Sequence, residues 1–240
     1  MQNALSIYTT RDAWCNAAAH VIAKTTCAGI DVRGRCAIAL AGGTTPRPLY
    51  ERLAEVPWRD RIEWSTTHFF WGDERCVPID HPDSNYRMAH ETLLSRVPVP
   101  PENIHRVPVE LGVPSAIARA YEMELRAFFG VRGVPAFDLM LLGMGADGHI
   151  ASLFSGDAAL EEQERCVVDT WNHRCRPPVP RVTMTLPVIN HARNVAFLVT
   201  GGEKRRVMEE ILRDPAGAAT KYPAARVKPH GELVWFVAEC

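Results

Sequence analysis

A carboxylate and an imidazole stand two residues apart in one glycine-rich segment, at Asp147 and His149. Gly143, Gly145 and Gly148 surround them, and this spacing breaks a helix and lets the backbone turn sharply or approach a ligand closely. An imidazole has a reference pKa of about 6.5, so it can accept a proton from water near neutral pH. The residues alone also fit a plain turn, in which Asp147 caps a following helix and His149 is structural. The segment therefore predicts either an acid-base pair or an ordinary strand-to-helix turn.

The apolar run at residues 139–142 must position this turn, and it predicts a central strand. The run is short enough for a strand and uniformly apolar, as expected when both faces of a parallel sheet are covered. Ligands of open α/β sheets bind in the crevice beyond the carboxyl ends of the strands. We therefore expect Asp147 and His149 at a ligand-binding edge.

A second glycine-rich turn follows a predicted buried strand at residues 36–40 and reads AGGTTPRPLYERLA. Gly42 and Gly43 are followed by the hydroxyl residues Thr44 and Thr45. Pro46 comes next and suits the first position of a helix. Backbone N–H groups, hydroxyls and the positive end of the helix dipole would converge there on an anion such as phosphate. A simple capped helix start is the alternative.

Two further polar clusters follow predicted strands at residues 66–71 and 195–199. Asp73 and Arg75 come after the first strand, and Lys204 begins the helix after the second. Because the carboxyl ends of parallel strands meet at one edge of a sheet, all these clusters are expected to border one cleft.

The remaining elements complete an alternating pattern of strands and helices. We predict strands at 5–8, 164–170, 181–186 and 233–237, and a weak strand at 103–107. Helices are predicted from Thr10 to Gly29, over 86–94 and over 115–129. The N-cap of the helix over 86–94 is expected to be Asp83 or Ser84. The pattern predicts an α/β fold: a three-layer α/β/α sandwich with a mostly parallel, Rossmann-like sheet. With 240 residues, 47% of them hydrophobic, we expect one domain spanning 1–240.

Charge and composition exclude several classes of protein. A formal net charge of -1 produces no field that would gather nucleic acid or anionic membrane, so we expect neither as a partner. The sequence shows no targeting segment or membrane span, which predicts a cytoplasmic protein. The seven cysteines lack a C-x-x-C pair, and His68, His81, His90 and His105 are dispersed without ligand spacing, so we expect no metal site.

Five segments in order resemble the glucosamine-6-phosphate isomerase/6-phosphogluconolactonase family, and its lactonases in particular. They are LAGGTTPRPLYERLA, FFWGDERCVPIDHPDSNYRMAHETLL, FDLMLLGMGADGHIASLFSG, PRVTMTL and VTGGEKRRVMEEIL. The resemblance implies a fold similar to glucosamine-6-phosphate deaminase and hydrolysis of 6-phospho-D-glucono-1,5-lactone to 6-phospho-D-gluconate in the oxidative pentose phosphate pathway. It implies no metal and no organic cofactor, and the protein is expected as a monomer or homodimer.

Small departures from the lactonase pattern leave a second activity open. Ile150 resembles the choice of the deaminases, and Ser155 stands where Pro is common among lactonases. The deaminases place a Glu after the Gly-His pair, whereas this chain reads SLFSG there. Asp73 stands where deaminases use an acid for proton abstraction. An amino-sugar phosphate deaminase or isomerase is therefore the alternative.

Lactone hydrolysis requires a base for water, donors for the developing oxyanion and an anchor for the phosphate. For the base we expect His149, oriented by Asp147 if a loop lets residues two apart meet. For the lactone or oxyanion we expect Arg75, with an ion pair to Asp73 or Glu74 as the alternative. The residues expected to bind the sugar phosphate are Gly42, Gly43, Thr44, Asp73, Arg181 and Lys204.

Overall fold

Six parallel strands form the central sheet of the computed structural model, which describes residues 3–173 and 175–239. Every neighbouring pair in this sheet is parallel, which confirms the predicted mostly parallel, Rossmann-like arrangement. The order across the sheet is β1-β9-β8-β5-β2-β3. The strands are β1 (Asn3–Tyr8), β2 (Cys36–Leu40), β3 (Thr67–Trp71), β5 (Leu139–Gly143), β8 (Asn194–Thr200) and β9 (Glu232–Ala238).

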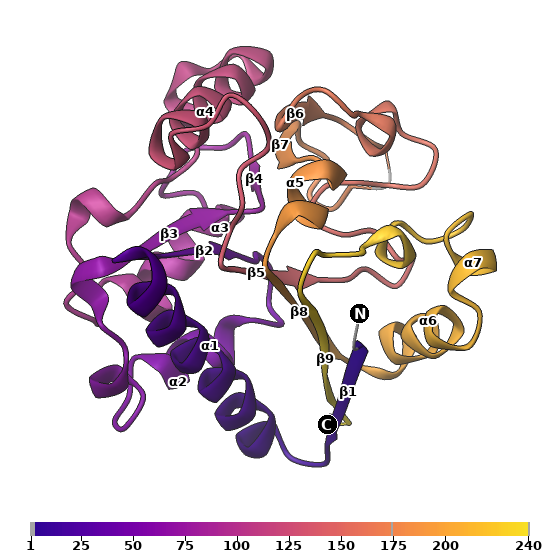
Figure 1. The fold of residues 1–240 in the computed structure, drawn as a ribbon. Coiled ribbons are helices and arrows are strands. Elements are labelled where there is room, and N and C mark those ends of the chain that lie inside the picture. Colours follow the sequence, from indigo (N-terminus) through magenta and orange to yellow (C-terminus); the bar gives the residue numbers. More distant parts are fainter. Residues whose placement is uncertain (1–2, 174, 240) are drawn as a thin grey trace.

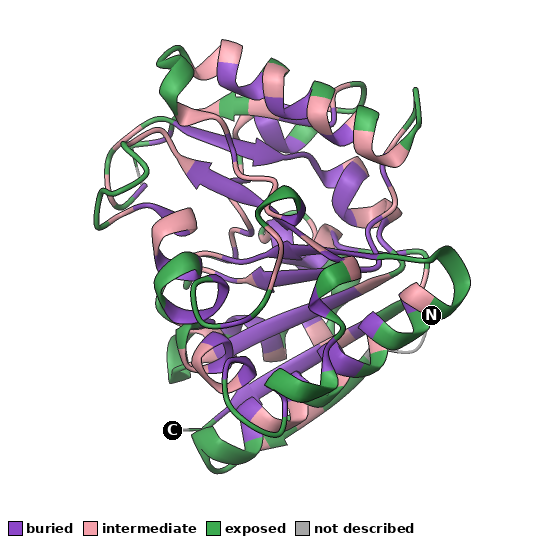
Figure 2. Cartoon of the chain, turned by 90° about the vertical axis from the view of Figure 1, so that its left-hand side faces the viewer, coloured by how far each residue is buried: buried purple, intermediate pink, exposed green. Residues whose placement is uncertain are grey.

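Helices cover both faces of this sheet, so the strands carry continuous apolar runs. All of β2 and all but the last residue of β5 are buried. Figure 1 shows α1 and α2 on one side of the sheet and α6 on the other, and Figure 2 shows the buried strands between helices with exposed outer faces. The helices are α1 (Arg11–Arg33), α2 (Arg47–Leu53), α3 (Asn85–Ala89), which continues as a π-helical turn (His90–Leu94), α4 (Pro114–Phe129), α5 (Leu186–His191), α6 (Gly202–Arg213) and α7 (Pro215–Ala218). No helix in the described residues is long and apolar enough to cross a membrane.

The chain reverses its direction across the sheet between β2 and β5. From β2 it continues to β3 on one side, and it then returns to place β5 on the other side of β2. Such a switch point opens a crevice at the carboxyl ends of the two strands, where the loops diverge. The predicted glycine-rich turns after β2 and β5 therefore face each other across this crevice.

A second, three-stranded antiparallel sheet was not predicted. Its order is β4-β7-β6, formed by β4 (Asp73–Arg75), β7 (Arg181–Met184) and β6 (Val167–Thr170). The polar residues after β3 thus form a short strand, and the register places Arg75 opposite Arg181 and Asp73 opposite Thr183. Pairing between segments so distant in sequence has no local signal, so the sequence revealed the strands at 167–170 and 181–184 but not their partner.

Several predicted element boundaries were wrong. Helix α1 continues past Gly29, whose missing side chain lets it pack against Cys36. The helix ends at Arg33, and Gly34 caps it with a φ of 73°. The weak strand at 103–107 forms only a bridge between Ile104 and Phe69. The strand predicted at 181–186 ends at Met184, because the next residues start α5.

Candidate active site

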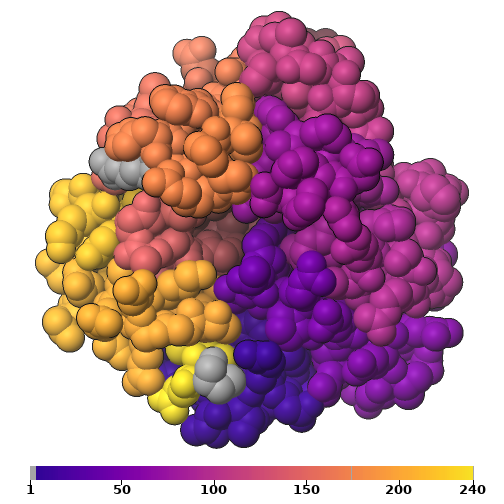
Figure 3. Space-filling model, turned by 180° about the vertical axis from the view of Figure 1, so that it is seen from behind, coloured from indigo at the N-terminus to yellow at the C-terminus, as the bar shows by residue number. Residues whose placement is uncertain are grey.

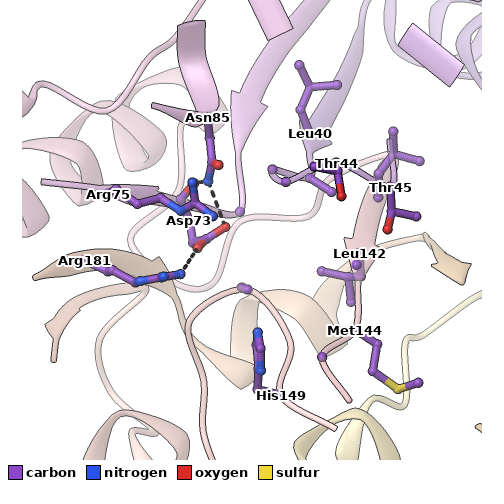
Figure 4. A pocket seen from close by; sticks show the side chains of 18 of the residues that line it. Leu40, Thr44, Thr45, Asp73, Arg75, Asn85, Leu142, Met144, His149 and Arg181 are labelled. Carbon is purple, nitrogen blue, oxygen red and sulfur yellow. Dashed lines mark hydrogen bonds and ion pairs between the residues drawn. The ribbon is translucent and has the colours of Figure 1, made fainter. Parts of the chain in front are cut away.

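A cavity of about 220 Å³ opens at the switch point, at the carboxyl ends of β2 and β5. Figure 3 shows the surface hollowed where the segments after β2, β3 and β5 meet, and Figure 4 shows the side chains that face the cavity. Every predicted site residue except Asp147 lines it. The lining residues are 40–45, Gly72, Asp73, Arg75, Asn85, 141–145, His149, Ala151, Arg181 and Lys204.

His149 and Asp147 meet directly through their side chains. Asp147 Oδ1 lies 2.5 Å from His149 Nδ1 and also accepts the His149 backbone N–H at 3.2 Å. Residues two apart can do this because the segment is a loop, in which Gly148 has a φ of 76°. Gly145 is required for close approach, since a Cβ there would lie 2.2 Å from His149 Nδ1. Asp147 therefore lies behind the imidazole rather than in the cavity.

The Asp147 carboxylate determines which imidazole nitrogen carries the proton. Burial raises the pKa of Asp147, but the hydrogen bond and charge of His149 outweigh this, so the pKa falls below its ordinary value and the group stays ionised. An ionised carboxylate only accepts, so Nδ1 must donate. One face of the imidazole packs on Phe154, with ring centroids 4.4 Å apart. Nε2 has no hydrogen-bond partner in the described part of the chain, so it is available to accept a proton.

Opposite the imidazole, the hydroxyls of the loop after β2 lie beside a cation from the start of α6. Gly43 has a φ of 82°, and Thr44 and Thr45 follow it at the cavity wall. Lys204 Nζ donates to Thr45 Oγ1 at 3.4 Å. Burial lowers the pKa of Lys204, and no carboxylate of the described residues forms an ion pair with it. This half-buried ammonium therefore lacks a compensating anion within the protein.

A second group of polar side chains, which includes Asp73 and Arg181, forms the wall across the cavity from Thr44 and Thr45, as Figure 4 shows. Asp73 Oδ2 accepts the Ser152 hydroxyl at 2.7 Å and lies 3.8 Å from Arg181 Nη1, while its Oδ1 accepts from Asn85 at 3.3 Å. Arg181 is only 4% exposed and also donates to the Arg176 carbonyl at 2.9 Å. The carboxylate of Asp73 is thus fully engaged. The structure places Arg181 across the cavity from Thr44 and Thr45, and its contact with phosphate stays a prediction.

Arg75 forms neither of the ion pairs considered as alternatives. Its guanidinium Nη1 donates to the Asp83 carbonyl at 2.6 Å, and only its backbone N–H contacts Glu74, at 2.8 Å. Burial raises the pKa of Glu74 to about 7, although backbone N–H groups that include those of Asn85 and Tyr86 partly oppose the increase. Arg75 therefore faces the cavity with a charge that no carboxylate in the described residues neutralises.

Three polar residues at this site were not among the predicted ones. Thr45 was expected as a hydroxyl of the anion-binding turn but was not named as a substrate-binding residue, and Ser152 gave no signal. Asn85 lies directly after Ser84, the N-cap of α3, which explains its position but does not reveal its contacts. Its Nδ2 donates to the Asp73 carbonyl at 2.9 Å, and its buried Oδ1 has no partner. Gly42 leaves room for this amide, because a Cβ there would lie 1.9 Å from Asn85 Oδ1.

The chain is similar to known proteins in both sequence and structure. The sequence pattern of the family described as glucosamine-6-phosphate isomerases/6-phosphogluconolactonase matches residues 9–235. A 6-phosphogluconolactonase of Synechocystis is 46% identical over 85% of this chain and 82% of its own. The structure of 6-phosphogluconolactonase from Thermotoga maritima is 33% identical, with a TM-score of 0.84 over 99% of this chain and 100% of its own. A monomeric glucosamine-6-phosphate deaminase, 18% identical with a TM-score of 0.81 over 98% and 97% of the two chains, shares the fold. The chain belongs to the glucosamine-6-phosphate isomerase/6-phosphogluconolactonase family.

Proposed function

We propose that this protein hydrolyses 6-phospho-D-glucono-1,5-lactone to 6-phospho-D-gluconate, as a step of the oxidative pentose phosphate pathway. One observation carries the proposal. A single cavity is lined by His149, which Asp147 contacts from behind, at one position and by the Lys204 ammonium with threonine hydroxyls at another. An ester carbonyl and a phosphate on one small molecule require such a pair of sites. The similarity to named lactonases supports the same activity.

In the proposed reaction, His149 Nε2 takes a proton from water as the water oxygen bonds to C1 of the lactone. The negative charge that develops on the carbonyl oxygen is stabilised by the Arg75 guanidinium, which lines the cavity. When the tetrahedral intermediate collapses, the bond from C1 to the ring oxygen breaks, and His149 returns its proton to that oxygen. Asp147 keeps Nδ1 protonated and stabilises the imidazolium between the two transfers.

The phosphate is held by charge and hydroxyl groups rather than by a metal. Its site combines Gly43, Thr44 and Thr45 of the loop after β2 with Lys204 of α6. A phosphate monoester carries about -1.5 to -2 charges near neutral pH, so it would neutralise the half-buried Lys204 ammonium. The backbone at Gly42 and the guanidinium of Arg181 complete the proposed sugar-phosphate contacts from neighbouring walls.

The amino-sugar phosphate deaminase is less well supported. A deaminase mechanism would use Asp73 to abstract a proton from the substrate. The Asp73 carboxylate, however, already accepts hydrogen bonds from Ser152 and Asn85 and lies beside Arg181. The SLFSG segment also lacks the Glu expected for ring opening. We further propose a cytoplasmic protein that functions as a monomer or homodimer and binds neither nucleic acid nor membranes.

A coupled assay tests the function. Production of 6-phosphogluconate from freshly generated lactone should exceed the spontaneous rate, and ammonia release from glucosamine-6-phosphate should be absent. EDTA should not reduce the rate, because His149 activates the water. His149→Ala should lower kcat by about 10²- to 10⁴-fold. Lactone loss at the spontaneous rate, or a folded His149→Ala protein with wild-type kcat, would refute the proposal.

A further inference from the structure

The loop that contains Asp147, Gly148 and His149, here called the His149 loop, contacts a segment that is distant in sequence. The backbone carbonyl of Gly148 accepts from Ala224 N at 3.0 Å. The ring of Tyr222 packs directly on Gly148, because a Cβ at that position would lie 2.5 Å from Tyr222 Cδ1. Gly148 also has a φ of 76°, so any side chain there would be strained as well as blocked by the ring. The residue before His149 is therefore fixed by contact with Tyr222.

Tyr222 also connects this loop to α6. Its hydroxyl donates to Glu210 Oε2 at 2.8 Å, and this bond is the main reason that the pKa of Glu210 is lowered. Glu210 follows Lys204 by six residues on the same helix. An α-helix rises about 1.5 Å per residue, so roughly 9 Å of rigid helix separate them. The two groups that must act on one substrate, the imidazole and the ammonium, are thus joined through Tyr222 and Glu210.

We propose that Tyr222 is a positioning residue, which sets the place of the His149 loop relative to the phosphate site on α6. This inference rests on the proposed lactonase function. Tyr222 does not line the cavity and takes no part in the bond changes. Its effect follows from geometry, because a base displaced by about 1 Å from the attacking water can cost up to about 100-fold in rate. The aromatic ring fixes the loop, and the hydroxyl connects it to α6.

Two variants separate the ring from the hydroxyl. Tyr222→Ala removes both contacts and should lower kcat on the phosphorylated lactone about tenfold, with KM changed less than about threefold. Tyr222→Phe keeps the ring on Gly148 and should lose only about two- to fivefold in kcat. Arg206→Ala is the matched control, because Arg206 is an exposed cation on the same helix as Glu210 and does not line the cavity. This control should retain wild-type kcat.

A spectroscopic measurement distinguishes positioning from general stability. In the wild type, the Nδ1 proton of His149 should give a downfield NMR signal from its bond to Asp147, and Tyr222→Ala should broaden or remove it. Should Tyr222→Ala fail to fold, Tyr222→Leu replaces it with the same expectations. A folded Tyr222→Ala protein with wild-type kcat and an unchanged His149 signal would overturn the inference, even if its Tm is lower. If the wild type itself shows no lactonase activity, the proposed function fails, while the NMR comparison still tests the positioning.

Discussion

Lys204→Met is the most direct test of how the cavity recognises its substrate. The substitution removes the ammonium but keeps an unbranched side chain of similar length beside Thr45. Because no carboxylate in the described residues pairs with Lys204, its removal leaves no buried anion without a partner. Burial lowers the pKa of Lys204, which means that burial makes its charged form less stable than it would be in water. We therefore expect Tm to be maintained or to rise slightly.

The magnitude follows from the loss of one charged hydrogen bond. Such a bond is worth roughly 1.5 to 3 kcal/mol, and the half-buried position of Lys204 limits screening by solvent. This corresponds to a decrease of about one to two decades in kcat/KM for the phosphorylated lactone. The unphosphorylated gluconolactone lacks the group that Lys204 binds, so its kcat/KM should change less than about twofold.

The assay compares the two lactones under the same conditions, with the spontaneous opening of each subtracted. Arg206→Ala is the control, because Arg206 is an exposed cation on the same helix and does not line the cavity. It should leave both substrates unaffected. An equal decrease on both lactones, or no decrease on either, would show that Lys204 does not bind the phosphate.

Three further predictions concern other residues of the site. Asp147→Asn should lower kcat/KM by less than His149→Ala does, since it removes the orienting charge but not the base; a pH–rate profile compares them. Arg181→Ala should lower Tm, unlike Lys204→Met, because it leaves the buried Asp73 carboxylate without its cation. Glu74 binds its proton more tightly in the folded protein than in the unfolded chain, because burial raises its pKa to about 7. The free energy of unfolding should therefore fall by about 3 kcal/mol as pH rises from 4.5 to 7. Denaturant titrations of Glu74→Gln should lack this decrease.

The sequence alone determined the central sheet and the edge at which the site forms. Continuous apolar runs such as residues 36–40 and 139–142 indicate strands buried on both faces, and this signal is local. Glycines and polar residues directly after these runs then lie at the carboxyl ends of parallel strands. For this reason the sequence alone could predict that Gly43, His149 and Lys204 line one cavity.

The contact between Asp147 and His149 required the tertiary structure. In a helix, residues two apart point in different directions, and only the observed loop with Gly148 at positive φ brings the side chains to 2.5 Å. The glycines indicated a turn but not its dihedral angles. Gly29 shows the same limit, because it looks like a helix end in sequence and is in fact a packing position against Cys36.

Only the tertiary structure decided which polar residues share a wall of the cavity. Arg75 and Arg181 face each other because a three-residue strand pairs antiparallel with β7, and Ser152 reaches Asp73 across 79 residues of sequence. Likewise, Tyr222 contacts Gly148 from a segment more than seventy residues away. Such contacts depend on register and packing between distant segments, which local propensity and periodicity do not encode.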